Sequence, residues 1–173
     1  MISRRFCNLE ACYNNAYRKK VNAYWMDKLA PGGAVLELPW NEFENKEGQA
    51  MKVTKGMPIV AYATKSGDGY SVYNCEDFKV VRWNLAKQEI TIETAHNDGK
   101  EEVFMVMPFK VFTAVMCPGY CISIYKSQGV TWSEPYSILQ FQKMKMLGDL
   151  GNKLLYVAFS RATSKDIINI AEL

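Results

Sequence analysis

Two short segments in the last third of the chain carry residue types that could do chemistry. Residues 122–131 read Ile-Ser-Ile-Tyr-Lys-Ser-Gln-Gly-Val-Thr and combine hydroxyl, amide and ammonium groups with a glycine. Residues 154–163 begin with an almost entirely apolar stretch, which is followed by Ser160 and Arg161. A guanidinium presented from a buried element is suited to neutralising charge on a phosphate. From spacing alone, the same residues also fit an ordinary polar strand end and an ordinary arginine at a helix end.

Other kinds of site find little support in the sequence. Cys117 and Cys121 are spaced as Cys-x3-Cys, but no second Cys or His pair completes four zinc ligands, and His96 lies in a turn sequence. We therefore predict no metal site. The Gly-Lys pair at Gly99 is followed by Glu101, so it does not match a phosphate-binding loop. The sequence shows no P-loop with which to hold a nucleotide.

Composition places the chain among folded, intracellular proteins. Of its 173 residues, 49% are hydrophobic and 23% charged, which is ordinary for a globular domain. No run approaches the roughly 18 apolar residues of a membrane span, so we expect a soluble protein without a membrane partner. Five cysteines, an odd number, favour a reducing compartment, cytoplasm or nucleus, over a disulfide framework.

Charge is distributed unevenly along the chain. Residues 1–38 contain six basic and three acidic residues, a net +3, and residues 118–173 contain six and four, a net +2. Residues 39–117 contain nine and eleven, a net −2. If the outer segments form one unit, that unit carries +5, although the whole chain carries only +3. Such a basic unit is a plausible footprint for a phosphate backbone.

The elements that must position the two segments follow from periodicity. We predict a strand over 8–13 and then a helix, in which Tyr17, Val21, Tyr24, Trp25 and Leu29 form the buried face. Asn14 or Asn15 would cap this helix, and the Pro-Gly-Gly of 31–33 would end it. Further strands are expected over 120–125, 136–141 and 167–170, with a helix over 152–162.

The middle of the chain has a different pattern. Runs rich in Val, Ile, Thr and aromatic residues predict strands over 57–64, 78–83, 89–94 and 103–112, with turn sequences at 66–69, 84–87 and 96–99. We therefore predict an α/β fold: a parallel-sheet lobe made of 1–38 and 118–173, interrupted by a small SH3-like antiparallel β-barrel over 39–117.

The two chemical segments resemble motifs V and VI of superfamily 1 helicases of the RecD/Dda/PIF type. They occur in the family's order and at its spacing, with a β insertion where that branch keeps an SH3-like subdomain. Residues 11–22, Ala-Cys-Tyr-Asn-Asn-Ala-Tyr-Arg-Lys-Lys-Val-Asn, are similar to the strand-then-helix motif sometimes called IVa. The resemblance implies the second, C-terminal RecA-like lobe of a DNA helicase. The divergence of the motifs from cellular versions favours a viral source.

The resemblance also implies roles for individual residues. Arg161 would be the arginine finger, the catalytic residue that reaches the γ-phosphate of ATP. Gln128 and Gly129 would join it in ATP binding. Single-stranded nucleic acid would contact Asn14, Asn15, Ser123, Tyr125 and Lys126. The family usually has His in place of Tyr125 and Thr in place of Asn14, and each replacement can still donate a hydrogen bond to phosphate.

Partners and alternatives follow from the same likeness. ATP and Mg²⁺ would be held mainly by an N-terminal RecA-like lobe that carries the P-loop, so the chain by itself is predicted to be inactive as an ATPase. Arg18, Lys19, Lys20, Lys143 and Lys145 are candidate exposed phosphate contacts. The candidate base-stacking residues are Trp40, Trp83, Trp132 and the many tyrosines, although most of these are expected to pack in the core or the barrel. The alternatives are a non-catalytic nucleic-acid or protein binding module, with a protein partner on the barrel, and a lobe of an RNA helicase.

Overall fold

The computed structural model describes residues 9–30, 33–94 and 103–171. The chain divides into two compact units, one formed by Met1–Asn22 and Tyr120–Leu173 and the other by Ala23–Gly119. The first division falls inside the helix α1 (Asn15–Leu29), so this helix belongs to both units. The domain boundaries predicted from the sequence, after residues 38 and 117, stay a prediction.

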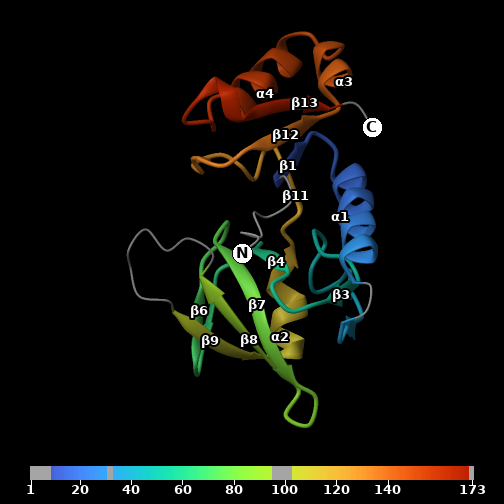
Figure 1. Cartoon of the computed structure of the whole chain (residues 1–173), viewed down its shortest axis with the longest axis vertical. Helices are drawn as coiled ribbons and strands as arrows, with labels where there is room; N and C mark the ends of the chain where they lie inside the picture. The colour runs from blue at the N-terminus through green and yellow to red at the C-terminus, as the bar shows by residue number, and fades with distance from the viewer. Residues whose placement is uncertain (1–8, 31–32, 95–102, 172–173) are drawn as a thin grey trace. The chain divides into compact units, whose positions relative to one another are not determined.

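The discontinuous unit is built on a four-stranded parallel sheet (Figure 1). Its strands, in spatial order, are β11 (Cys121–Ser123), β1 (Leu9–Cys12), β12 (Tyr136–Leu139) and β13 (Ile168–Ala171). All three neighbouring pairs are parallel. The helices α3 (Phe141–Lys145) and α4 (Asp149–Phe159) pack against each other, and the short 3₁₀ helix η1 (Lys165–Ile167) leads into β13.

The two central strands, β1 and β12, are covered on both faces, which is typical of parallel strands. Ala11 and Cys12 of β1 and Ile138 and Leu139 of β12 have no exposed surface. Side chains on both faces of these strands are therefore inside the core. Strands predicted over 8–13, 120–125, 136–141 and 167–170 are confirmed within a few residues, as is the helix predicted over 152–162, which begins at Asp149.

Helix α1 begins as predicted but buries a different face. The Asn14 side chain caps it, because its Oδ1 accepts hydrogen bonds from the backbone N–H of Ala16 at 2.8 Å and of Tyr17 at 3.2 Å. The predicted buried residues Tyr24 and Leu29 are 57% and 42% exposed, which makes that part of the prediction wrong.

The buried side of α1 is instead largely polar. Arg18 and Asn22 are fully buried, together with Val21 and Met26. Asn22 satisfies both backbone polar groups of Cys121 in the edge strand β11: its Nδ2 donates to the carbonyl oxygen at 3.0 Å, and its Oδ1 accepts from the N–H at 2.8 Å. Polar side chains with such partners can face a core, so the apolar pattern predicted the burial of Val21 but missed that of Arg18 and Asn22.

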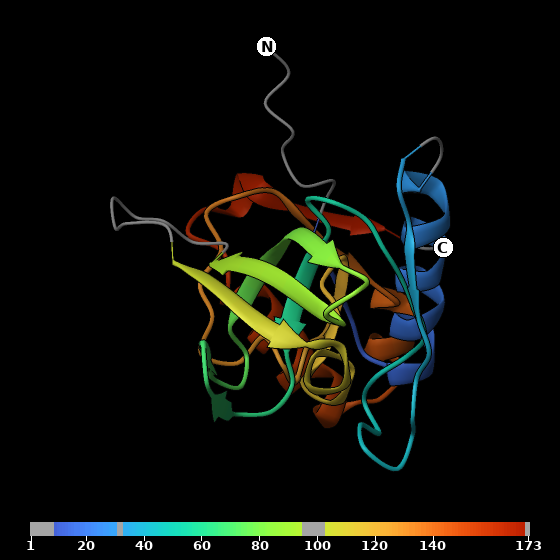
Figure 2. The same cartoon turned by 90° about the horizontal axis from the view of Figure 1, so that it is seen from below.

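The continuous unit contains antiparallel strands. Its five-stranded sheet has the order β10 (Met116–Pro118), β4 (Pro58–Ala61), β7 (Asp77–Asn84), β8 (Glu89–Thr94) and β9 (Phe104–Pro108). Two hairpins accompany it, β2 (Leu36–Leu38) with β3 (Met51–Val53) and β5 (Lys65–Gly67) with β6 (Tyr70–Val72). Figure 2 shows β7, β8 and β9 side by side, with the helix α2 (Phe109–Val115) seen end-on next to them.

Three of the four strands predicted here are confirmed, and the fourth is half wrong. Residues 103–112 were predicted to be one strand, but the strand ends at Pro108 and α2 begins at Phe109. Pro108 lacks an N–H to continue a strand ladder, and Phe109, Phe112 and Val115 then bury one side of a helix. The turn predicted at 96–99, with His96, lies outside the described residues.

The predicted fold class is confirmed: a parallel-sheet α/β layer is accompanied by separate antiparallel sheets, as in a RecA-like lobe with inserted β elements. The closer assignment of the insertion to an SH3-like barrel stays a prediction. Within the described ranges, no helix is both long enough and apolar enough to cross a membrane.

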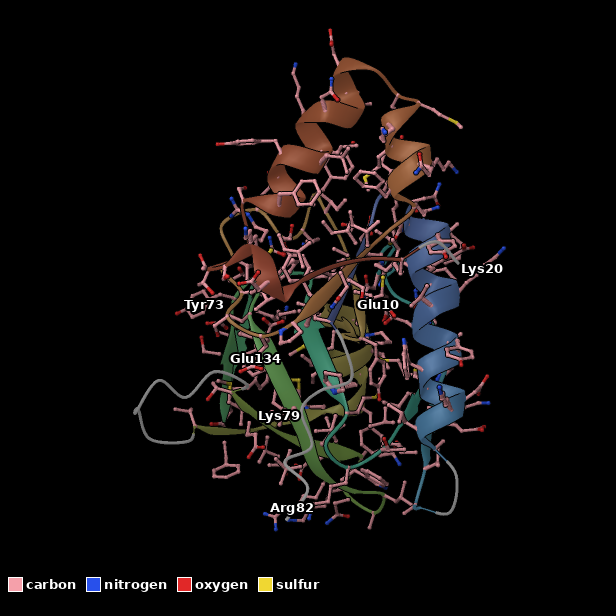
Figure 3. The ribbon with its side chains drawn as sticks, turned by 45° about the horizontal axis from the view of Figure 1, so that its top comes forward. Glu10, Lys20, Tyr73, Lys79, Arg82 and Glu134 are labelled. Carbon is pink, nitrogen blue, oxygen red and sulfur yellow. The ribbon has the colours of Figure 1, made fainter. Side chains whose placement is uncertain are left out.

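The link between Asn22 and Cys121 yields a stability prediction. Asn22→Ala removes both hydrogen bonds and leaves a buried N–H and a buried carbonyl unpaired, so the free energy of unfolding should fall by about 2–4 kcal/mol. Lys20→Ala, an exposed change on the same helix (Figure 3), should alter it by less than about 0.5 kcal/mol. Urea unfolding measures both; equal effects would contradict the role assigned to Asn22.

A pair of buried thiols yields a reactivity prediction. The Sγ atoms of Cys12 and Cys121 lie 3.6 Å apart with no exposed surface, and the hydrogen bond to Cys12, with burial, raises the pKa of Cys121 well above its usual value. Both should resist iodoacetamide at pH 8 in the native protein, since the thiolate is the reacting form. Among the cysteines that the structure describes, Cys75 is half-buried and should react before Cys12 and Cys121. Peptide mapping by mass spectrometry checks this; early labelling of Cys12 would contradict it.

Candidate nucleic-acid and phosphate interface

The carboxyl ends of the parallel strands gather most of the predicted site residues at one edge of the sheet. Residues that follow β1 and residues that follow β11 meet there, because Cys12 pairs with Ser123 and the N–H of Ile124 donates to the Cys12 carbonyl oxygen at 2.9 Å. Edges of this kind are where open α/β sheets bind ligands. Asn14, Asn15, Ser123, Tyr125 and Lys126, which lie in these two segments or start α1, are thereby brought together.

Asn14 connects two strand ends as well as capping α1. Its backbone N–H donates to the Oε1 of Gln140 at 3.2 Å, and these residues are 126 positions apart. Gln140 directly follows β12 and adopts a left-handed conformation, with φ 61°. Such a conformation is uncommon for a residue other than glycine and often marks a functional position. Sequence reasoning missed Gln140, since nothing in the sequence distinguishes it from other glutamines.

The turn after β11 is held by its own hydrogen bonds. The fully buried Ser127 donates through Oγ to the Ile124 carbonyl oxygen at 2.7 Å, and the N–H of Lys126 donates to the Ser123 carbonyl oxygen at 2.9 Å. Gly129 has φ +86° and no atom within 4 Å of an added Cβ, so the backbone conformation rather than space demands glycine. Tyr125 and Gln128 are left exposed on the outside of this turn.

Arg161 lies at the end of α4 and reaches back to this turn. Leu154, Leu155 and Ala158 are buried on one side of the helix, so α4 is packed in place up to its last turn. The guanidinium of Arg161 donates through Nη1 to the Val130 carbonyl oxygen at 3.1 Å, through Nε to the Val157 carbonyl oxygen at 3.2 Å, and through Nη2 to Ser160 Oγ at 2.9 Å. Three of its five N–H groups thus donate to neutral oxygen atoms, which leaves two N–H groups that could donate to an anion.

The backbone joins the same two segments. The N–H of Trp132 donates to the Arg161 carbonyl oxygen at 2.7 Å, and the N–H of Thr163 donates to the Trp132 carbonyl oxygen at 3.0 Å. Gln128 and Gly129, predicted to bind ATP together with Arg161, lie directly before Val130, whose carbonyl the guanidinium contacts. The two chemical segments therefore form one hydrogen-bonded assembly, a relation that the sequence alone left open.

Tyr136 contacts both segments of this assembly. Its hydroxyl donates to the Ala158 carbonyl oxygen at 2.5 Å, and its ring lies 4.4 Å from that of Trp132, centroid to centroid. Burial raises the pKa of Tyr136, and the positive charge of Arg161 opposes that shift. The guanidinium is therefore close to a neutral, buried phenol. Trp132 is only 5% exposed, so its predicted role in base stacking is wrong.

The structure also corrects the list of candidate phosphate contacts. Arg18 is fully buried, with its Nε donating to Asn15 Oδ1 at 2.6 Å, so it is not an exposed basic residue. Lys20 on the same helix is exposed, and its side chain points outward (Figure 3). Lys143 and Lys145 of α3 are also exposed.

The described residues offer no site for a metal ion: they contain no group of three or more His, Cys, Asp or Glu side chains that could hold one. What the edge does offer is amide, hydroxyl and ammonium groups, and the Arg161 guanidinium contacts the segment that follows β11. These groups suit a phosphate chain rather than a cation.

Comparison with known proteins shows a likeness of fold. No protein-family model and no curated protein sequence matches the chain. Among solved structures, it is similar to the Pif1 helicase of Candida albicans, with 16% identity and a TM-score of 0.66, over 98% of this chain and 46% of that one. It is also similar to a Bacteroides Pif1 bound to ssDNA, with 19% identity and a TM-score of 0.63, over 98% and 42% of the two chains.

A third similar structure is a Bacteroides Pif1 in complex with ADP-AlF3 and ssDNA, with 21% identity and a TM-score of 0.58 over 98% of this chain and 42% of that one. The chain thus spans less than half the length of each of these proteins. At this level of identity, the likeness establishes a shared helicase-like fold.

Proposed function

We propose that this chain is the C-terminal RecA-like lobe of an ATP-dependent helicase that moves along single-stranded DNA. The observation that carries the proposal is the hydrogen bond from Arg161 to the Val130 carbonyl oxygen. It joins a segment suited to phosphate charge to a segment that also borders the polar edge of the sheet. The similar Pif1 structures that contain ssDNA and ADP-AlF3 support both halves of the proposal.

The distribution of charge supports nucleic-acid binding by the discontinuous unit. The sequence of Met1–Asn22 and Tyr120–Leu173 contains eleven basic and five acidic residues, a net +6. The sequence of Ala23–Gly119 contains ten basic and thirteen acidic residues, a net −3. Phosphate contacts dominate binding that is independent of base sequence, so the basic unit is the one we assign to the strand.

We assign the residues at the edge and in the neighbouring segment to two different ligands. Asn14, Asn15, Ser123, Tyr125 and Lys126 would contact the strand, and Arg161, with Gln128 and Gly129 beside it, would contact the phosphates of ATP. ATP, when bound, supplies the free energy of hydrolysis. Mg²⁺ and the remaining phosphate contacts would come from an N-terminal RecA-like lobe that carries the P-loop.

The role of Arg161 in this chain is to bring positive charge to the phosphate from a fixed position. The carbonyl oxygens of Val130 and Val157 hold the guanidinium, so little side-chain entropy is lost when it meets an anion. Any displacement of Arg161 would act on Val130 and on the turn from Ser123 to Gly129. This is the route by which we propose that ATP hydrolysis moves the strand-binding edge.

Binding to single-stranded DNA tests the first half of the proposal. The wild-type chain should bind a fluorescein-labelled oligothymidine with an affinity that falls with salt, whereas Lys126→Ala should bind more weakly and reduce the slope of log K against log salt by about 0.7. Lys165 is exposed in η1, which precedes β13 and therefore lies at the amino end of that strand, away from the carboxyl ends that form the proposed edge. Lys165→Ala should leave the slope unchanged.

Fluorescence anisotropy from low to moderate salt measures these slopes. An absence of binding at low salt would refute nucleic-acid binding, and with it both the helicase lobe and the nucleic-acid binding module. Tighter binding to oligouridine RNA than to DNA would favour the RNA helicase alternative instead.

ATP hydrolysis tests the second half. The chain alone should show no ATPase activity above background. Joined to its P-loop lobe, it should show DNA-stimulated activity, and Arg161→Ala and Arg161→Lys should each lower kcat by about 10³-fold or more, since an ammonium does not reproduce the fork of a guanidinium. A phosphate-release assay measures these rates. Full activity of Arg161→Ala would contradict the arginine-finger role and favour a non-catalytic module.

A further inference from the structure

Two tyrosines lie together at the edge where the strand is proposed to bind. Tyr13 directly follows β1, and Tyr125 lies two residues after β11. Their ring centroids are 6.5 Å apart, and the ring planes are inclined at 47°. Tyr125 is 50% exposed and Tyr13 is half-buried. The sequence assigned Tyr125 to the phosphate backbone and singled out no individual tyrosine for base stacking.

Neither phenol is held in place by a hydrogen bond of its hydroxyl among the residues that the structure describes. The backbone that carries each ring is held in place, because β1 and β11 are neighbours in the sheet and the turn after β11 is internally bonded. Two aromatic faces are therefore presented from rigid elements without an internal polar partner. Such faces lose little conformational entropy when a flat apolar ligand stacks on them.

The neighbours of the two rings are suited to a phosphate chain. Asn14 follows Tyr13, and Lys126 follows Tyr125. The acidic Glu134 and Asp166 lie before β12 and before β13, at the opposite ends of those strands. An aromatic surface flanked by amide and ammonium groups is the arrangement by which proteins bind single strands: bases stack while the backbone meets the charged groups.

We propose that Tyr13 and Tyr125 form a stacking surface for a nucleobase of the bound single strand. The inference rests on the proposed function and adds to it a base contact and a residue, Tyr13, to which the motif resemblance assigned no contact. It also changes the expected role of Tyr125, whose ring rather than hydroxyl makes the contact. Stacking of this kind tolerates any base, so it is compatible with movement along a strand of arbitrary sequence.

The test compares oligothymidine of about 12 nucleotides with a strand of equal length and charge whose central residues lack bases. Tyr13→Leu and Tyr125→Leu should each weaken binding to oligothymidine about tenfold and leave binding to the base-free strand unchanged. Tyr13→Phe and Tyr125→Phe should stay within twofold of wild type on both strands. Tyr156→Leu, a change at a 75% exposed tyrosine of α4, is the matched control.

The outcomes separate the inference from the function on which it rests. Equal losses for the Phe and Leu variants, or equal losses on both strands, would overturn stacking in favour of a hydroxyl–phosphate contact. The wild-type protein provides a check that needs no variant to fold: equal affinity for the two strands overturns stacking alone. An absence of binding to either strand overturns the proposed function itself.

Discussion

The position of β1 between β11 and β12 is the constraint on which the rest of the structure depends. Its parallel pairing with both neighbours brings residues near the start of the chain next to residues more than 100 positions later. The entropic cost of closing so long a loop grows only slowly with its length. A whole β-rich unit can therefore be inserted in the sequence between β1 and the other three strands of the sheet. Without this pairing, the edge that gathers Asn14, Tyr125 and Gln140 would not exist.

The second feature is the joining of the two chemical segments. The guanidinium of Arg161 and the backbone of Trp132 connect the end of α4 to the residues that follow β11. The same turn carries Tyr125 and Lys126 at the polar edge. In the proposed function, a change in what Arg161 contacts would reach the strand contacts through these hydrogen bonds.

Several parts of the fold follow from the sequence because they depend on local physics. Short strands that alternate with helical patterns predict a parallel α/β layer, and an asparagine before a helical pattern predicts the cap that Asn14 forms. Other parts depend on partners that are distant in the chain. Asn22 is buried where it hydrogen-bonds the edge strand β11, and the buried face of α1 is rotated from the predicted one, with Val21 common to both. The break between β9 and α2 was missed because Val103–Phe112 reads as one apolar run.

The sequence by itself determined the motif residues, their order and the kind of ligand that they suit, because residue type and spacing carry that information. Only the tertiary structure decided which of them act together. It placed Gln140 against Asn14 and the ring of Tyr13 beside that of Tyr125, and it removed Arg18 and Trp132 from the accessible surface. The physical reason is that burial and side-chain proximity depend on which strands pair, and strand pairing here joins residues that are far apart in the chain.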